Sequence, residues 1–348
     1  MQNGVFQTGN PRWSAVFSLF MGVMALIAAE FIPVSLLTPI ARDLAVSEGM
    51  AGQTVTAVGV LAVLTSLLLA PLTGNTDRRR ILLAFSAMLV ASYMLIGMAP
   101  TYSIMLIGRA ILGICVGGFW SLASAVTLQL VPTKDVPRAL SIVYAGVSVA
   151  TIIALPVASW IGHLIGWRNV FFLGALMAAF GFVWQYRALP SLPARTGSGF
   201  RDMSALLRRT WILAGIGGNI LSFGGYHIFF TYLRPFLELD LALGANTLSV
   251  ILLVFGVANV LGTFIAGALL GNHFRSTMIL VHLAFTAAAL ALLLSQGHAD
   301  IGIALAVFWG FAFGFTPVGW STWIARTLSD KAELAGGLTV AATQFAIG

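Results

Sequence analysis

Charged residues are scarce in this sequence, and acidic ones are the scarcest. Asp, Glu, Lys and Arg together make up 8% of the 348 residues, whereas an ordinary soluble domain carries about 25%. Hydrophobic residues make up 59% of the chain. This composition excludes a soluble globular domain and predicts an all-α protein that crosses the lipid bilayer several times.

Cysteine and the common catalytic motifs are also nearly absent. Cys115 is the only cysteine, so the chain cannot form an internal disulfide. The sequence contains no GxxxxGK[ST] phosphate loop, no HExxH, no Cys or His cluster with metal-ligand spacing and no nucleophile elbow. We therefore expect no enzymatic activity, no cofactor and no metal, and transport would have to use an ion gradient.

The positive charges report topology. The net charge is +7, but the basic residues stand in short clusters between apolar runs, which argues against a nucleic-acid partner. One set of alternate loops holds fourteen Lys and Arg residues and the other set only three, Arg42, Arg168 and Arg234. Because positive loops stay in the cytoplasm, this bias predicts a cytoplasmic N-terminus.

Ten apolar runs are long enough to be membrane spans. They lie near residues 14–40, 53–73, 81–99, 103–130, 139–163, 168–188, 211–236, 246–270, 277–295 and 301–325. An eleventh begins near residue 333 and is cut short at the end of the chain. We therefore expect a fragment that ends within helix 11.

A polar stretch divides the spans into two sets. Residues 189–210 are rich in Arg, Pro and Gly and are predicted to be a cytoplasmic linker. Residues 1–188 would form a six-helix bundle, and 211–348 an incomplete one with helices 7–10 and part of 11. The sequence FWS at 119–121 matches GWS at 319–321, and other weak matches share this offset, as in transporters built from two related halves.

Two charges lie deep inside predicted spans, away from the span ends. Glu30 is the only acidic residue at membrane depth, and Arg109 is the only basic one. A charge in hydrocarbon costs at least about 2.5 kcal/mol, so each needs a partner or a function. Arg109 shares a helix face with Gly113 and Trp120. The pair is either a proton-coupling site or a static ion pair that fixes helix packing.

Aromatic and polar residues inside the spans suit a flat, polar, uncharged solute, which stacks on rings and forms hydrogen bonds at its edges. Our candidates for a substrate cavity are Trp120, Tyr226, His227, Trp309 and Trp320. His227 is also a second proton candidate. Other polar residues within the spans include Asn219, Asn259 and His282. The alternative for all of them is helix-to-helix hydrogen bonding.

The loop GNTDRRRIL at 74–82 places an acid among three arginines. Topology accounts for the arginines but not for Asp77. We expect a gating loop made by Gly74, Asp77, Arg78 and Arg79, in which Asp77 either caps the next helix or bridges to a neighbouring helix end.

These motifs resemble those of the major facilitator superfamily, in its twelve-helix drug:proton antiporter branch. GNTDRRRIL is similar to a shortened form of the family's loop between helices 2 and 3. LIGRAILGICVGG at 106–118 is similar to its helix 4 motif, whose arginine is tied to proton coupling and is here Arg109. The helix 5 signature is degenerate, with Ala154 and Ala158 in place of glycines. The resemblance implies alternating access in a monomer of the bacterial inner membrane.

Longer stretches, such as residues 30–53 and 317–337, resemble the nucleoside exporters of that branch. This resemblance implies proton-driven export of purine ribonucleosides such as inosine and guanosine, with Glu30 as the proton carrier and Arg109 as the charge that modulates it. Two alternatives stay open: efflux of drugs or sugars by the same mechanism, and a membrane sensor or scaffold that transports nothing.

Overall fold

A computed structural model describes residues 11–194, 199–237, 241, 243, 245–294 and 298–347, and every regular element in this part of the chain is a helix. In order, the elements are α1 (Trp13–Ser35), α2 (Leu37–Asp43), α3 (Glu48–Thr73), α4 (Arg78–Gly97), α5 (Tyr102–Leu130), η1 (Thr133–Asp135), α6 (Val136–Ile165), α7 (Trp167–Ala188), α8 (Phe200–Leu207), α9 (Thr210–Pro235), α10 (Ala245–Asn272), α11 (Phe274–Leu294), α12 (Ala299–Phe313), α13 (Phe315–Thr327), η3 (Ser329–Lys331) and α14 (Ala332–Ile347).

The helices agree with the predicted membrane spans. Ten segments of the described chain are long and apolar enough to cross a bilayer, and they match the ten predicted apolar runs. The eleventh run corresponds to α14. A helix satisfies all its main-chain hydrogen bonds internally, which is why apolar runs of this length adopt it in lipid. The protein is therefore a multi-pass membrane protein.

Three boundaries differ from the sequence prediction. The run at 14–40 is divided into α1 and α2 just after Pro33, which lacks the N–H that a continuous helix needs. The run at 301–325 is divided at Gly314, where a side chain would overlap the main chain of α10. The linker is not wholly irregular, because it contains α8.

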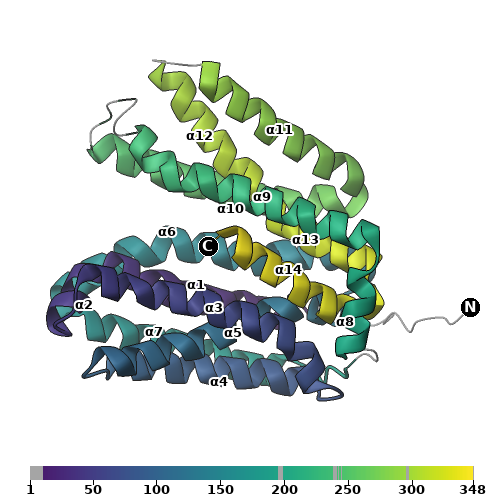
Figure 1. The fold of residues 1–348 in the computed structure, drawn as a ribbon, viewed down its shortest axis with the longest axis horizontal. Coiled ribbons are helices and arrows are strands. Elements are labelled where there is room, and N and C mark those ends of the chain that lie inside the picture. Colours follow the sequence, from purple (N-terminus) through teal and green to yellow (C-terminus); the bar gives the residue numbers. More distant parts are fainter. Residues whose placement is uncertain are drawn as a thin grey trace, which may run out of the picture.

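The helices form two groups that lie side by side in Figure 1, α1–α7 below and α9–α13 above. Within the lower group α1 packs on α6, α3 on α5, and α4 on α7. Helix α14 lies between the groups and contacts α3 and α5 on one side and α9 on the other. Gly336 and Gly337 permit this approach, because a Cβ at either would overlap main-chain atoms of Ser121 or Ser66. A second contact between the groups joins α6 to α10.

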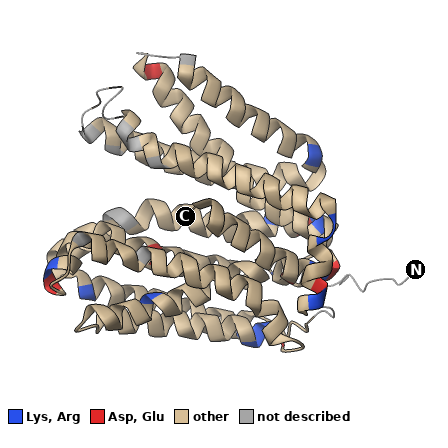
Figure 2. Ribbon diagram, viewed as in Figure 1, with Lys and Arg blue, Asp and Glu red and all other residues tan. Residues whose placement is uncertain are grey.

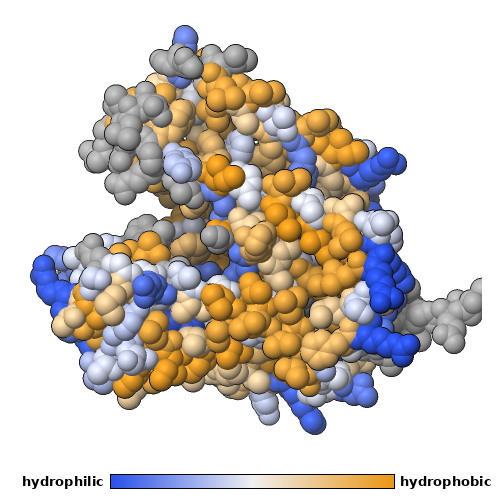
Figure 3. Space-filling view, viewed as in Figure 1, coloured by the Kyte–Doolittle hydropathy of each residue, from blue (hydrophilic) through white to orange (hydrophobic). Residues whose placement is uncertain are grey.

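The two ends of the molecule differ. Most charged residues lie at helix ends, and the middle of the bundle is almost free of them (Figure 2). At the end that carries α8 and the start of α14 the two groups meet, whereas at the opposite end a hollow opens between them (Figure 3). We call these the closed end and the open end.

Candidate functional site

Arg109 is buried completely in the N-terminal group, on α5. Its Nε donates to the Thr54 carbonyl oxygen at 2.9 Å, and Nη1 donates to the Ala29 carbonyl oxygen at 2.7 Å. Nη2 donates to the main-chain carbonyl oxygen of Glu30 at 3.4 Å. A guanidinium only donates and a carbonyl only accepts, so these bonds satisfy the buried cation. They also tie α5 to α1 and α3.

Glu30 lies beside Arg109, a proximity that the sequence left open. Its side chain is partly exposed on α1 and interacts electrostatically with the guanidinium. The cation is held by main-chain carbonyls, so it does not depend on the Glu30 carboxylate for its hydrogen bonds. This arrangement differs from a static ion pair in which each charge satisfies the other.

The rest of the Arg109 face is a helix contact. A Cβ at Gly113 or Gly117 would overlap main-chain atoms of α3, so these glycines let α3 and α5 touch. Trp120 lies further along α5 and stacks on Tyr144 of α6, with ring centroids 4.8 Å apart. The Tyr144 hydroxyl is 2.7 Å from Ser321 Oγ on α13. Trp120 therefore lies where the two groups of helices meet.

The other predicted cavity residues belong to the C-terminal group. Tyr226 stacks on Phe313, and Trp309 stacks on Phe229 with ring centroids 4.3 Å apart. The indole nitrogens of Trp309 and Trp320 are buried and have no hydrogen-bond partner among the described residues. Such N–H groups are able to donate to a solute that enters between the helices.

The two histidines of the C-terminal spans differ in their contacts. His227 Nδ1 lies 3.2 Å from the Phe223 carbonyl oxygen of its own helix, and its ring meets Tyr226 edge-on. His282 makes two polar contacts, with Ser222 Oγ and with the Met278 carbonyl oxygen, each at 2.7 Å. The sequence shows His282 only as one polar residue within a span, because its partner Ser222 lies on another helix.

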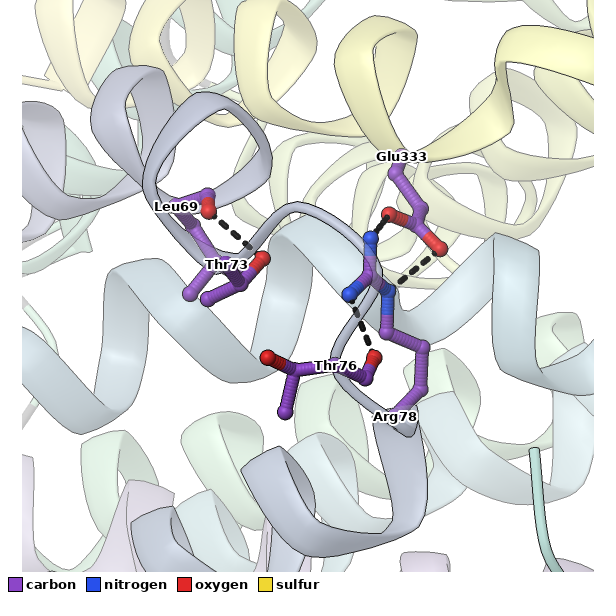
Figure 4. A network of polar contacts seen from close by, with 5 residues as sticks. All are labelled: Leu69, Thr73, Thr76, Arg78 and Glu333. Atoms are coloured by element: carbon purple, nitrogen blue, oxygen red, sulfur yellow. Dashed lines mark hydrogen bonds and ion pairs between the residues drawn. The ribbon is translucent and has the colours of Figure 1, made fainter. Parts of the chain in front are cut away.

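The predicted gating loop holds the closed end together through Arg78 (Figure 4). Arg78 is completely buried, and both its Nε and its Nη2 donate to the carboxylate of Glu333 in the first turn of α14. Nη1 donates to the Thr76 carbonyl oxygen at 2.7 Å. The bidentate geometry makes this a strong, oriented contact. It joins α4 to α14 across 255 residues of sequence.

Asp77 plays both of the roles that the sequence left open. Its carboxylate accepts from the Arg79 main-chain N–H at 2.8 Å and so caps α4. It also accepts from Ser191 Oγ at 2.6 Å and from the Leu192 N–H at 2.9 Å, beyond the end of α7. Partial burial raises the pKa of Asp77, but these hydrogen bonds and the charge of Arg80 outweigh it and hold the pKa below its ordinary value.

The remaining loop residues complete this turn. Gly74 has a φ of 48°, a backbone conformation that glycine adopts without strain. Arg79 Nη2 donates to the Tyr186 carbonyl oxygen at 2.6 Å, and the guanidinium lies over the Tyr186 ring. The loop thus joins α3, α4 and the end of α7 into one unit, and Arg78 links that unit to α14.

Further contacts lie at the closed end. Lys331 Nζ is 2.9 Å from a carboxylate oxygen of Asp202 on α8. Arg326 Nη2 donates to the carbonyl oxygens of Leu270 and Gly271 at 2.9 and 2.6 Å, and so satisfies the end of α10. In the described part of the chain, His, Cys, Asp and Glu residues do not gather into a group that could hold a metal ion.

This fold and these motifs match known proteins. The family model described as Major Facilitator Superfamily matches residues 16–348. The chain belongs to this superfamily. It is 41% identical over 336 residues, 97% of this chain and 85% of the relative, to the purine ribonucleoside efflux pump NepI of Salmonella paratyphi C (strain RKS4594). It is 40% identical, with the same coverage, to the protein of that name from Salmonella enteritidis PT4 (strain P125109).

Solved structures confirm the fold of the superfamily. The proton:xylose symporter XylE bound to 6-bromo-6-deoxy-D-glucose superposes with a TM-score of 0.78 at 15% identity, covering 97% of this chain and 86% of the other. The human organic anion transporter MFSD10 (TETRAN) superposes with a TM-score of 0.75 at 17% identity, covering 98% and 92%. At these identities the likeness concerns the fold alone.

Proposed function

We propose that this protein exports purine ribonucleosides, such as inosine and guanosine, in exchange for protons across the bacterial inner membrane. The observation that carries the proposal is the identity of 41% over 97% of the chain to a protein named as a purine ribonucleoside efflux pump. A carboxyl group beside a permanently held cation within the membrane supports the proton-coupled part of the proposal.

The proposed orientation places the N-terminus and the closed end in the cytoplasm. The excess of Lys and Arg in alternate loops supports it. The structure then corresponds to an outward-facing state, with the hollow open to the periplasm. Residues 1–188 and 211–348 are the two halves that rock against each other in a monomer, joined by the linker at 189–210.

The proposed cycle depends on competition between a proton and the solute. Deprotonated Glu30 is attracted to Arg109, and protonation from the periplasm removes that attraction. The released side chain lets α1 and α3 shift relative to the C-terminal group, and the outward-facing and inward-facing states therefore differ in their affinity for the proton. Solute binding favours the deprotonated state, so that inward proton movement drives outward solute movement.

The proposed solute site lies between the groups of helices and uses Trp120, Tyr226, His227, Trp309 and Trp320. A purine stacks well on aromatic rings, and its ring nitrogens and carbonyl oxygen accept hydrogen bonds. The unpartnered indole N–H groups of Trp309 and Trp320 support such a site.

The test is proton flux in inside-out vesicles that contain the protein. An acid-inside gradient is imposed, inosine is added, and partial collapse of the gradient is expected. Glu30→Gln should abolish the inosine response, whereas Asp300→Asn, a matched change of an exposed carboxylate at the start of α12, should keep it. Collapse of the gradient with a cationic drug or a sugar, but not with inosine, would contradict the proposed substrate. No response to any solute would favour a membrane sensor that transports nothing.

A further inference from the structure

His282 and Ser222 form a polar cluster in the C-terminal group that the mechanism above does not use. His282 lies on α11 and Ser222 on α9, and both are partly buried. The imidazole ring also meets the indole of Trp320 edge-on, with centroids 6.4 Å apart. The cluster therefore adjoins one of the proposed solute contacts.

The partners of the imidazole fix where its protons can be. Nδ1 lies 2.7 Å from the Met278 carbonyl oxygen, which only accepts, so Nδ1 must carry a proton. Nε2 lies 2.7 Å from Ser222 Oγ. That hydroxyl lies 2.6 Å from the Gly218 carbonyl oxygen as well, and it has one proton to donate.

Two proton arrangements satisfy the series of hydrogen bonds that runs from the Met278 carbonyl oxygen through His282 to Ser222. If Ser222 donates to Nε2, the imidazole is neutral with its proton on Nδ1. If the hydroxyl rotates and donates to the Gly218 carbonyl oxygen, its lone pair faces Nε2, which then needs a second proton. Rotation of one hydroxyl thus prepares the ring to accept a proton from water without breaking any other contact.

Charged groups of the surrounding helices lie near the helix ends in sequence. Helix α11 packs on α10, α12 and α13, and Ser222 brings in α9. Helix α10 has no titratable residue, α12 has Asp300 in its first turn, and α13 has Arg326 in its last turn. Helix α9 carries Tyr226, His227, Tyr232 and Arg234, and α11 itself carries Arg275. The ring contacts in the structure are with Ser222, Met278, Phe285 and Trp320.

We propose that His282, held by Ser222, is a second proton-binding site, in the C-terminal group of helices. His227 is a weaker candidate, because its polar contact with the Phe223 carbonyl oxygen lies within its own helix and joins it to no other. The role of this site in transport rests on the proposed function, since His282 lies beside Trp320, one of the proposed solute contacts, and its charge would act on a solute bound there. Binding of the proton itself does not depend on that function.

The test is ¹⁵N NMR of histidine-labelled protein in lipid nanodiscs, with the His282 signal assigned by its loss in His282→Gln. At alkaline pH the signal should be that of the neutral ring protonated at Nδ1, and on acidification it should become that of imidazolium. Ser222→Ala removes the hydroxyl that faces Nε2 in both arrangements, so the pH dependence of this signal should change. His273→Gln, at an exposed position before α11, should leave the His282 signal unchanged.

Two results would overturn the proposal: a neutral ring protonated at Nε2, or a titration that Ser222→Ala does not alter. Transport adds a separate readout. His282→Gln should flatten the pH dependence of inosine-driven proton flux while the inosine response persists, and unaltered pH dependence would exclude the site from transport. Complete lack of inosine response in the unmodified protein would contradict the proposed function but not the proton site.

Discussion

Arg78 and Arg109 are both completely buried, and each cation needs hydrogen-bond acceptors. The two arginines find these acceptors on different kinds of partner. Arg109 donates to main-chain carbonyls of α1 and α3, which belong to its own group of helices. Arg78 donates to the carboxylate of Glu333 on α14, which also contacts α9 of the other group. Main-chain partners travel with their helix group, whereas a side-chain partner on another helix can be lost. We therefore expect the Arg109 contacts to persist in every conformation and the Arg78 contact to open.

The largest effect is expected from Arg109→Lys. Lysine keeps the charge but cannot reach carbonyl oxygens on two helices from one ammonium group. Each hydrogen bond lost from the buried cation costs about 1.5–3 kcal/mol. Inosine-driven proton flux should fall by at least about 100-fold, equivalent to roughly 2.7 kcal/mol, and the melting temperature should fall too. Arg42→Lys, at an exposed position in α2, is the control. Near-normal flux in Arg109→Lys would refute the role assigned to the guanidinium hydrogen bonds of Arg109.

Breaking the contact between Arg78 and Glu333 should change the conformation of the protein more than the stability of its fold. Glu333→Gln leaves a buried cation without its counter-charge, which costs the closed arrangement about 3–5 kcal/mol. A cysteine placed at Ser124, which is buried between α5 and α13, should then react at least about 10-fold faster with an impermeant maleimide from the closed end.

The double variant sharpens this test. Arg78→Gln combined with Glu333→Gln removes the unpaired charge. The closed end should therefore open less in the double variant than in Glu333→Gln alone. Strictly additive effects of the two substitutions would show that the side chains do not act as a pair.

A smaller effect is expected at Asp77. Asp77→Ala removes the cap of α4, which costs about 1 kcal/mol of unfolding free energy. Since the folded-state pKa of Asp77 is held below the ordinary 3.8, the stabilisation is present above that pH and is lost as the pH falls through the folded-state pKa. Melting temperatures of the two proteins should therefore differ at neutral pH and converge in strong acid. A difference that persists in strong acid would show that the ionised Asp77 carboxylate is not what stabilises this turn.

The smallest effect is expected from Asp202→Asn, which breaks the partly exposed contact with Lys331 at the same closed end. Solvent and salt screen such pairs. Maleimide reactivity at Ser124→Cys should stay as in the parent protein, at low and at high salt. An opening as large as that of Glu333→Gln would show that the buried pair is not what closes this end.

The sequence predicted most of what depends on local pattern. Spans follow from apolar runs, and Arg109 and Glu30 are conspicuous as charges within them. The partner of Arg78 could not be found in this way, because Glu333 is one of several acids at helix ends and becomes its partner only when α14 packs on α3 and α5. The break at Gly314 also depends on a contact, with α10, that no local pattern reveals.

Distances measured by pulsed electron paramagnetic resonance test the central comparison most directly. Spin labels are placed in a Cys115→Ser background, at positions that are all exposed. Labels at Arg80→Cys and Arg275→Cys measure the distance between the two groups of helices near the closed end. Labels at Arg80→Cys and Lys134→Cys measure a distance within the N-terminal group. Glu333→Gln should lengthen the first distance in a larger fraction of molecules and leave the second unchanged. Identical distributions with and without Glu333→Gln would contradict the assignment of the Arg78–Glu333 pair as the contact that closes this end.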